Sequence, residues 1–124
     1  MIVLIDEYLQ NQLLLARVLA RYPAPLEIFD TVESALAAVF RSKPDLIIVN
    51  ITARLQNSAL EIVKHLRAQG IGCPIVALVA YPMSPEQLEV FNQEYDEFLV
   101  KPYSPQELHR VLERQLSTRA AVRG

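Results

Sequence analysis

The chain has 124 residues, of which 52% are hydrophobic, and its formal net charge is −2. This length suits one domain with a sizeable core, and a mean hydropathy of +0.19 argues against disorder. We expect no nucleic-acid partner, because the basic residues are scattered, and no membrane partner, because no apolar run could span a bilayer. Cys73 is the only cysteine, which excludes an intrachain disulfide and favours a cytoplasmic setting.

Apolar runs alternate with amphipathic segments along the chain. In chain order we expect strand 2–5, helix 8–21, strand 26–29, helix 31–41, strand 44–50, helix 58–69, strand 74–80, helix 84–94, strand 97–100 and helix 105–117. Ser84-Pro85 and Ser104-Pro105 are typical helix starts, because serine caps the first turn and proline fits the first helical position. In the helix that follows Ser84, we expect Leu88 and Phe91 to face the core. Gly70 suits a left-handed helix end. We expect residues 1–117 to form the domain and residues 118–124 to be a flexible tail or the start of a linker.

This alternation predicts the fold class. Five strands and five helices in turn form a doubly wound parallel sheet covered on both faces, which is an α/β fold. The segment Pro44 to Asn50 reads PDLIIVN, and its unbroken apolar run indicates a strand in the middle of that sheet. Sites of open α/β sheets lie at the carboxyl ends of such strands, so we expect the functional residues near Asn50.

The first expected helix is apolar on two sides. We expect its core stripe to be Leu14, Leu15, Val18 and Leu19. The nearly opposite side carries Leu9, Leu13, Ala16 and Ala20. An ordinary surface helix has only one apolar side, so this second side is a candidate interface with a partner.

Polar residues follow three of the expected strands. Asp6 and Glu7 follow the first strand, Asn50 ends the central one and Lys101 follows the last. Parallel strands bring these residues to one edge of the sheet, where the carboxylates could hold a divalent cation and the lysine could neutralise an anion. Polar residues also emerge at strand ends for purely structural reasons, so the pattern alone leaves both interpretations open.

Several segments together resemble a response-regulator receiver domain of the CheY-like type. The matching segments are IVLIDE, PDLIIVN, PIVALVA and DEFLVKPYSPQEL, spread over residues 1 to about 117. The resemblance implies a flavodoxin-like three-layer fold with strand order 2-1-3-4-5, and it is compatible with a cis peptide bond between Lys101 and Pro102. It also implies a role in two-component signal transduction or a phosphorelay.

The departures from the family pattern lie at the positions that make and read phosphorylation. The phosphorylated Asp of the family is replaced by Asn50, whose amide cannot attack phosphorus as a carboxylate does. The phosphate-binding Thr or Ser is replaced by Val79, and the switch aromatic is Phe98, which has no hydroxyl. The acidic pair and Lys101 are retained, which is the pattern of a degenerate pseudo-receiver.

The missing third carboxylate also weakens the expected metal site. We expect no cofactor, and either no metal or weak Mg²⁺ binding at Asp6 and Glu7, because Asn50 adds no charge to attract the ion. Arg54 or Lys101 could pair with the acidic residues in its place. Alternatively, Arg54 points to solvent.

The sequence therefore predicts a non-enzymatic, phosphorylation-independent receiver that acts as a protein-protein interaction module in bacterial signalling, with a signalling protein or a second copy as its partner. Its last two helices are the usual partner face of the family, where Tyr95 and Tyr103 are candidate interface residues. The alternative is a sensor in which the vacated pocket around Asn50, Val79 and Phe98 binds an apolar or quinone-like ligand. Phosphorylation of Asp6 or Glu7 is a third, disfavoured possibility, since they would be the metal ligands.

Overall fold

A computed structural model describes residues 1–80 and 83–123, and the side chains of these residues except Phe40 and 117–123. Strands and helices alternate along the chain. The strands are β1 (Ile2–Ile5), β2 (Leu26–Phe29), β3 (Leu46–Ile51), β4 (Ile75–Val79) and β5 (Glu97–Val100). The helices are α1 (Leu9–Leu19), α2 (Val32–Ser42), α3 (Ala59–Ala68), α4 (Pro85–Glu94) and α5 (Pro105–Arg123), with a 3-10 helix η1 (Ala53–Ser58) before α3.

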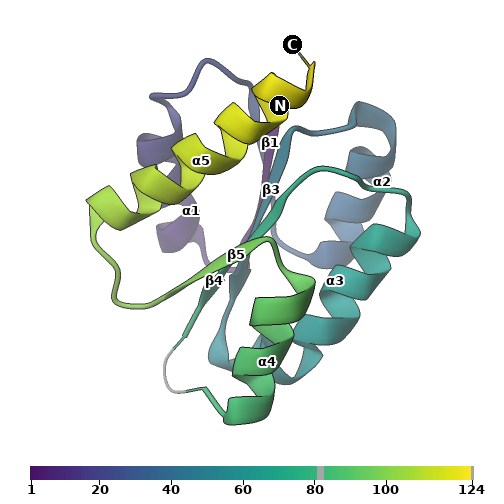
Figure 1. Ribbon diagram of the computed structural model, residues 1–124, viewed down its shortest axis with the longest axis vertical. Coiled ribbons are helices and arrows are strands. Elements are labelled where there is room, and N and C mark those ends of the chain that lie inside the picture. The colour runs from purple at the N-terminus through teal and green to yellow at the C-terminus, as the bar shows by residue number, and fades with distance from the viewer. Residues whose placement is uncertain (81–82, 124) are drawn as a thin grey trace.

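The five strands form one parallel sheet in the order β2-β1-β3-β4-β5, as the sequence predicted. Helices α1 and α5 cover one face of this sheet, and α2, α3 and α4 cover the other (Figure 1). Strand β3 is buried along its whole length, because it has a strand on each side and a helical layer on each face. The expected doubly wound three-layer fold is therefore confirmed.

Side chains that alternate along each strand divide the core into two clusters. Ile2 and Leu4 pack with the buried side chains of α1 and α5, including Leu15 and Leu112. The intervening positions of the strands pack with α2, α3 and α4. This period of two explains why β1, β3 and β4 read as continuous apolar runs: both of their faces are covered.

The predicted helix ends are largely confirmed. Ser84 forms a capping box with Gln87 at the start of α4, and Gly70 has a φ of +81° after α3. The Lys101–Pro102 peptide bond, between β5 and α5, is cis. The structure differs in adding η1 where we expected a loop and in continuing α5 to Arg123. Alanine and arginine are strong helix formers, which accounts for helix beyond residue 117; the domain boundary stays a prediction.

Three predicted burial assignments are wrong. Leu14 is 63% exposed, because the buried stripe of α1 is Gln12, Leu15 and Leu19. Leu88, which we expected to face the core with Phe91, is 42% exposed in the first turn of α4, and Figure 1 shows this end of α4 reaching past the strands.

Tyr95 is the third wrong assignment, since it is only 4% exposed and cannot offer its ring to a partner. Its hydroxyl donates a hydrogen bond to the Ala59 carbonyl oxygen at 2.9 Å, and its ring lies 5.3 Å from that of Phe91. Burial raises the pKa of this hydroxyl. Tyr95 therefore joins α3 to the end of α4 as a core residue.

Among the described helices, none combines the length and apolarity needed to cross a bilayer.

Candidate functional site at the carboxyl edge of the sheet

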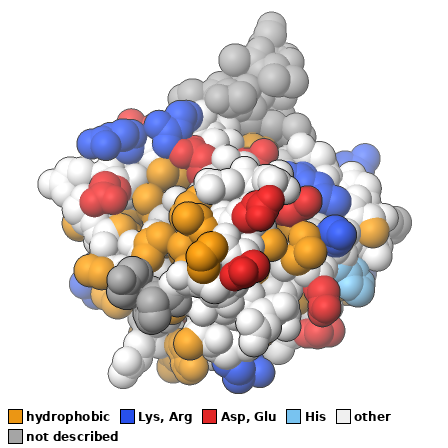
Figure 2. Space-filling view, turned by 60° about the horizontal axis from the view of Figure 1, so that its bottom comes forward, with side chains coloured by type: hydrophobic (Ala, Val, Ile, Leu, Met, Phe, Trp, Pro, Cys, Tyr) orange, Lys and Arg blue, Asp and Glu red, His pale blue; other side chains and the backbone are white. Residues whose placement is uncertain are grey.

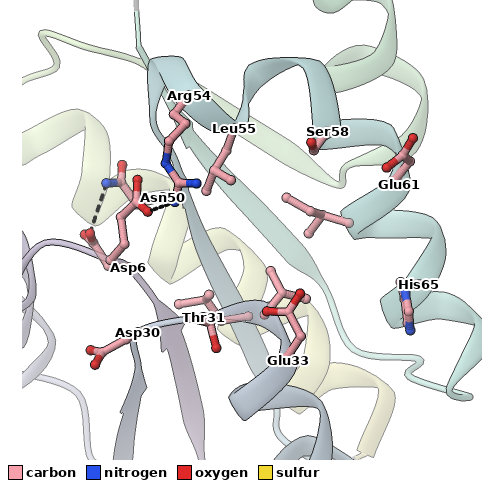
Figure 3. A pocket seen from close by; sticks show the side chains of 14 residues that line it. Asp6, Asp30, Thr31, Glu33, Asn50, Arg54, Leu55, Ser58, Glu61 and His65 are labelled. Atoms are coloured by element: carbon pink, nitrogen blue, oxygen red, sulfur yellow. Dashed lines mark hydrogen bonds and ion pairs between the residues drawn. The ribbon is translucent and has the colours of Figure 1, made fainter.

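The register of β1 and β3 brings Asp6 and Asn50 together. Ile5 pairs with Val49, so the next residues, Asp6 and Asn50, are neighbours across the two strands. The Asn50 side-chain amide donates a hydrogen bond from Nδ2 to Asp6 Oδ1 at 3.2 Å (Figure 3). Both residues are 1% exposed. The position expected to carry a phosphoacceptor therefore serves as a buried hydrogen-bond donor to the acidic pair.

Burial raises the pKa of Asp6 above its ordinary value, since desolvation disfavours the charged carboxylate. Hydrogen bonds from the Tyr8 backbone N–H, at 3.0 Å, and from the Asn50 side chain oppose this effect, as do the positive charge of Lys101 and the side-chain amide of Asn11. Asp6 Oδ2 and Asn50 Oδ1 are both buried and, among the described residues, neither accepts a hydrogen bond. The site thus keeps two acceptor atoms that the described part of the chain does not satisfy.

We expect Asp6→Asn to raise the free energy of unfolding by about 1–3 kcal/mol near pH 8, the range for a buried polar group that lacks full compensation. The native pKa of Asp6 is raised, so its ionisation destabilises the fold progressively as pH rises above the ordinary value of 3.8. The gain should therefore vanish below about pH 3.8. Urea unfolding of the wild type and of Asp6→Asn across this pH range measures the difference in their free energies of unfolding. A variant less stable than the wild type at pH 8 would contradict the raised native pKa of Asp6.

Glu7 is bound by the segment that follows β3. Thr52 donates from Oγ1 to Glu7 Oε1 at 2.8 Å, and the Arg54 guanidinium forms an ion pair with Glu7 Oε2. The Arg54 hydrogen bond is the main cause that lowers the pKa of Glu7. Of the two alternatives that the sequence left open, the pairing of Arg54 with the acidic pair is the one that the structure shows.

Lys101 reaches the same edge from the end of β5. Its backbone N–H donates to the Val79 carbonyl oxygen at 2.9 Å, which continues the pairing of β5 with β4. Burial lowers the pKa of the ammonium group, and the charge of Asp6 opposes that effect. Two carboxylates, Asp6 and Glu7, thus face two cations, Arg54 and Lys101. On this face of the molecule, Figure 2 shows acidic and basic side chains close to hydrophobic ones.

This arrangement does not suit a magnesium site. Mg²⁺ prefers carboxylate oxygens, but Glu7 already binds Arg54 and Thr52, and Asn50 turns a donor toward Asp6. Among the described residues, no group of three or more His, Cys, Asp or Glu side chains is placed to hold a metal ion. The charges of the site are balanced by side chains of the chain itself.

Val79 and Phe98 lie away from the acidic pair. Val79 is fully buried and pairs with Ile51 and Val100 in the sheet. Phe98 is half-buried, with its ring 5.7 Å from that of Phe91. Of the depressions formed by described residues, two are lined by Asn50, and neither of these two includes Val79 or Phe98. The pocket expected around Asn50, Val79 and Phe98 stays a prediction.

Sequence reasoning missed Gln12 and Thr52. Gln12 is buried and donates from Nε2 to the Asp6 carbonyl oxygen at 2.6 Å and to Asp30 Oδ1 at 2.7 Å. Two signals were present. Gln12 precedes Leu15 by three residues and so lies on the buried face of α1, and Thr52 follows Asn50 by two residues, so both side chains emerge on one side of the chain.

A parallel sheet of this order, with an acidic pair and a lysine at its carboxyl edge, defines the class of receiver-type signalling domains. Residues 2–113 match the family described as response regulator receiver domain, and the chain belongs to this family. The resemblance seen in the sequence is thus confirmed at the level of the family. It places the chain among the receiver domains of two-component signalling.

Solved structures share the fold. NtrX from Brucella abortus in complex with ADP matches with a TM-score of 0.81 and 21% identity, over 98% of this chain and 27% of NtrX. Chemotaxis protein CheY4 of Vibrio cholerae matches with a TM-score of 0.76 and 24% identity, over 93% and 97% of the two chains. The receiver domain of a Pseudomonas aeruginosa PAO1 sensor histidine kinase, with a magnesium ion in its active-site cleft, matches with a TM-score of 0.78 and 22% identity, over 94% and 96%. These identities show the fold alone, and the chain spans about a quarter of NtrX.

Proposed function

We propose that this receiver domain works without phosphorylation and acts as a protein-protein interaction module. The observation that carries the proposal is the hydrogen bond from the buried Asn50 amide to Asp6 at 3.2 Å. An amide nitrogen delocalises its lone pair and its oxygen is a poor nucleophile, so Asn50 does not form an acyl phosphate. The side chain acts as a structural link between β1 and β3 instead.

The charge balance of the site supports the same proposal. A phosphoryl group on an active receiver is attracted by a cation and by donor side chains, and its arrival changes their contacts. Here Arg54 is already paired with Glu7, and Val79 has no hydroxyl to donate. A ligand shifts a conformational equilibrium only through contacts that differ between two states, and these residues offer few such contacts to a phosphoryl group.

The second apolar side of α1 is the proposed interaction surface. Leu9 is 66% exposed and Leu13 is 63% exposed, while Ala20 is exposed and Ala16 half-buried. The exposed leucines on this side of α1 support the proposal that it is an interface. Exposed leucines side by side on one helix mark interfaces more often than isolated ones do.

The face made by α4, β5 and α5 is the second candidate surface. Tyr95 does not contribute to it, but the exposed Leu88 does. Tyr103 is half-buried beside α5 rather than fully exposed. Counted over the described side chains, this face offers fewer exposed large apolar residues than α1, and we place the main partner contact on α1. The partner is a bacterial signalling protein or a second copy of the chain.

We expect Leu13→Glu to abolish association through α1 while leaving the free energy of unfolding within about 0.5 kcal/mol, because Leu13 is exposed. Sedimentation at increasing concentration tests self-association. Affinity capture with wild-type and Leu13→Glu bait compares retention of a partner. Gln10→Glu is the matched control, since it adds the same charge at an exposed position of the same helix without removing an apolar side chain.

Two outcomes would contradict this surface. If Leu13→Glu unfolds the protein, the exposed face of α1 has been assigned wrongly. If Leu13→Glu and Gln10→Glu both associate like the wild type, the partner binds elsewhere on the domain.

A further inference from the structure

A groove of about 290 Å³ lies between α1 and α5, next to the acidic pair. Its walls are mainly apolar and are formed by Leu14, Leu15, Val18, Tyr103, Pro105 and Leu108. Its volume is near the lower end of the roughly 300–1,000 Å³ typical of small-molecule sites. The groove is separate from the depression of Figure 3, which lies on the α2 and α3 side of the same strand ends.

The polar lining of this groove includes two buried residues, Asp6 and Asn50, together with Asn11, Arg17 and Lys101. Asp6 Oδ2 and Asn50 Oδ1 are each buried and accept no hydrogen bond from the described residues. Such oxygens cost free energy when they remain unsatisfied. A molecule that enters the groove and donates a hydrogen bond to either oxygen would remove that cost.

We propose that this groove binds a small apolar molecule that carries a hydroxyl group, such as a phenol. A hydroxyl can donate its hydrogen to the unsatisfied oxygen of Asp6 or Asn50 while its own oxygen accepts from the Lys101 ammonium. An organic cation is disfavoured by Lys101 and by Arg17, which also lines the groove. A molecule without a donor would leave both buried oxygens unsatisfied.

The exposure of Leu14 supports an apolar occupant. Leu14 is 63% exposed although it lines the groove beside the core residue Leu15. An occupant of the groove would cover part of this side chain and gain the free energy of burying apolar surface. Tyr103, predicted as an interface residue, lies at the opposite wall and offers an aromatic ring to the same occupant.

The test uses 4-methylphenol and toluene, which differ only in the hydroxyl group, and follows the amide chemical shifts of the chain. We expect 4-methylphenol to shift the amides of residues 11–18 and 103–108 with a dissociation constant on the order of 1 mM. Toluene should bind at least about tenfold more weakly, because it cannot satisfy a buried acceptor. Shifts that centre on residues 30–33 and 58–65 would overturn the proposal, because they would place the probe in the other depression.

Leu14→Trp and Leu13→Trp form a matched pair of variants. Both leucines are 63% exposed on α1, but only Leu14 lines the groove. Leu14→Trp should fill the groove and weaken 4-methylphenol binding at least about tenfold, while Leu13→Trp should bind like the wild type. Equal binding by the two variants, or equal affinity for the two probes, would overturn the proposal. A loss of self-association in Leu14→Trp alone, without probe, would also overturn it, by showing that a second copy occupies the groove.

Discussion

Asn50→Asp is expected to lower the free energy of unfolding by about 2–4 kcal/mol at pH 8 without metal. The substitution removes the donor that now faces Asp6 at 3.2 Å and puts a second carboxylate in its place, with both residues 1% exposed. Removing the partner of a buried group and leaving a charge uncompensated costs roughly 3–5 kcal/mol, and partial protonation of the pair would reduce that cost.

The pH dependence of this loss has a definite sign. Like-charge repulsion raises the native pKa of the paired carboxyls above the unfolded value of about 3.9. The loss should therefore be small near pH 4 and grow as pH rises through the raised pKa. Mg²⁺ should recover stability at pH 8, because a cation that binds only the folded state stabilises it by mass action.

Urea unfolding at pH 4 and pH 8, with and without Mg²⁺, measures both effects. Asn57→Asp is the matched control, since it adds the same charge at an exposed residue of η1. If the stability of Asn50→Asp is unaffected by Mg²⁺, the assignment of Asp6 and Glu7 as the acidic pair of a receiver site would be refuted.

Arg54→Ala in the Asn50→Asp background is expected to increase Mg²⁺ affinity at least about tenfold. Arg54 forms the ion pair with Glu7 and is the main cause of the low pKa of Glu7, so it competes with a metal ion for that carboxylate. Its removal frees Glu7 beside two other carboxylates. Arg54 is exposed, so the fold should tolerate the change.

Calorimetric titration with Mg²⁺ compares the single and double variants. Arg41→Ala in the same background is the control, because Arg41 is an exposed arginine at the far end of α2 from the site. Unchanged affinity in the Arg54→Ala double variant would mean that Arg54 does not take the place of a metal ion. Arg54→Ala alone should bind Mg²⁺ only weakly, since Asn50 still supplies no charge.

The fold could be predicted from the sequence because its signals are local. Unbroken apolar runs such as PDLIIVN and PIVALVA mark strands buried on both faces, and Ser84-Pro85 marks a helix start. The alternation of these elements leaves few topologies, and the observed strand order is the one that the resemblance implied.

Burial could be predicted less well, because it depends on which neighbour covers each face. Leu14 and Leu88 fit apolar helical patterns, yet no element of the described chain covers them fully. Tyr95 looks like a surface aromatic in sequence, but the packing of α3 beside α4 buries its ring and gives its hydroxyl a carbonyl partner. These outcomes depend on contacts between distant segments and leave no local signal.

The residues of the site could be predicted from the sequence, but the ion pairs and hydrogen bonds between them could not. Asp6, Glu7, Asn50 and Lys101 were expected at one edge, where the structure places them. The sequence could not decide whether Arg54 pairs with Glu7, because that depends on the path of η1. It also gave no sign of the groove beside Asn50 that lies between α1 and α5, because that groove depends on how these two helices are spaced on the sheet.

The most direct test of phosphorylation independence is the intact mass of the wild-type chain after incubation with acetyl phosphate and Mg²⁺. We predict no phosphoryl adduct, because Asn50 lacks the nucleophilic carboxylate and the acidic pair is already engaged by Asn50 and Arg54. A phosphoryl adduct that hydroxylamine removes would reveal an acyl phosphate on a carboxylate, and it would contradict the proposed function.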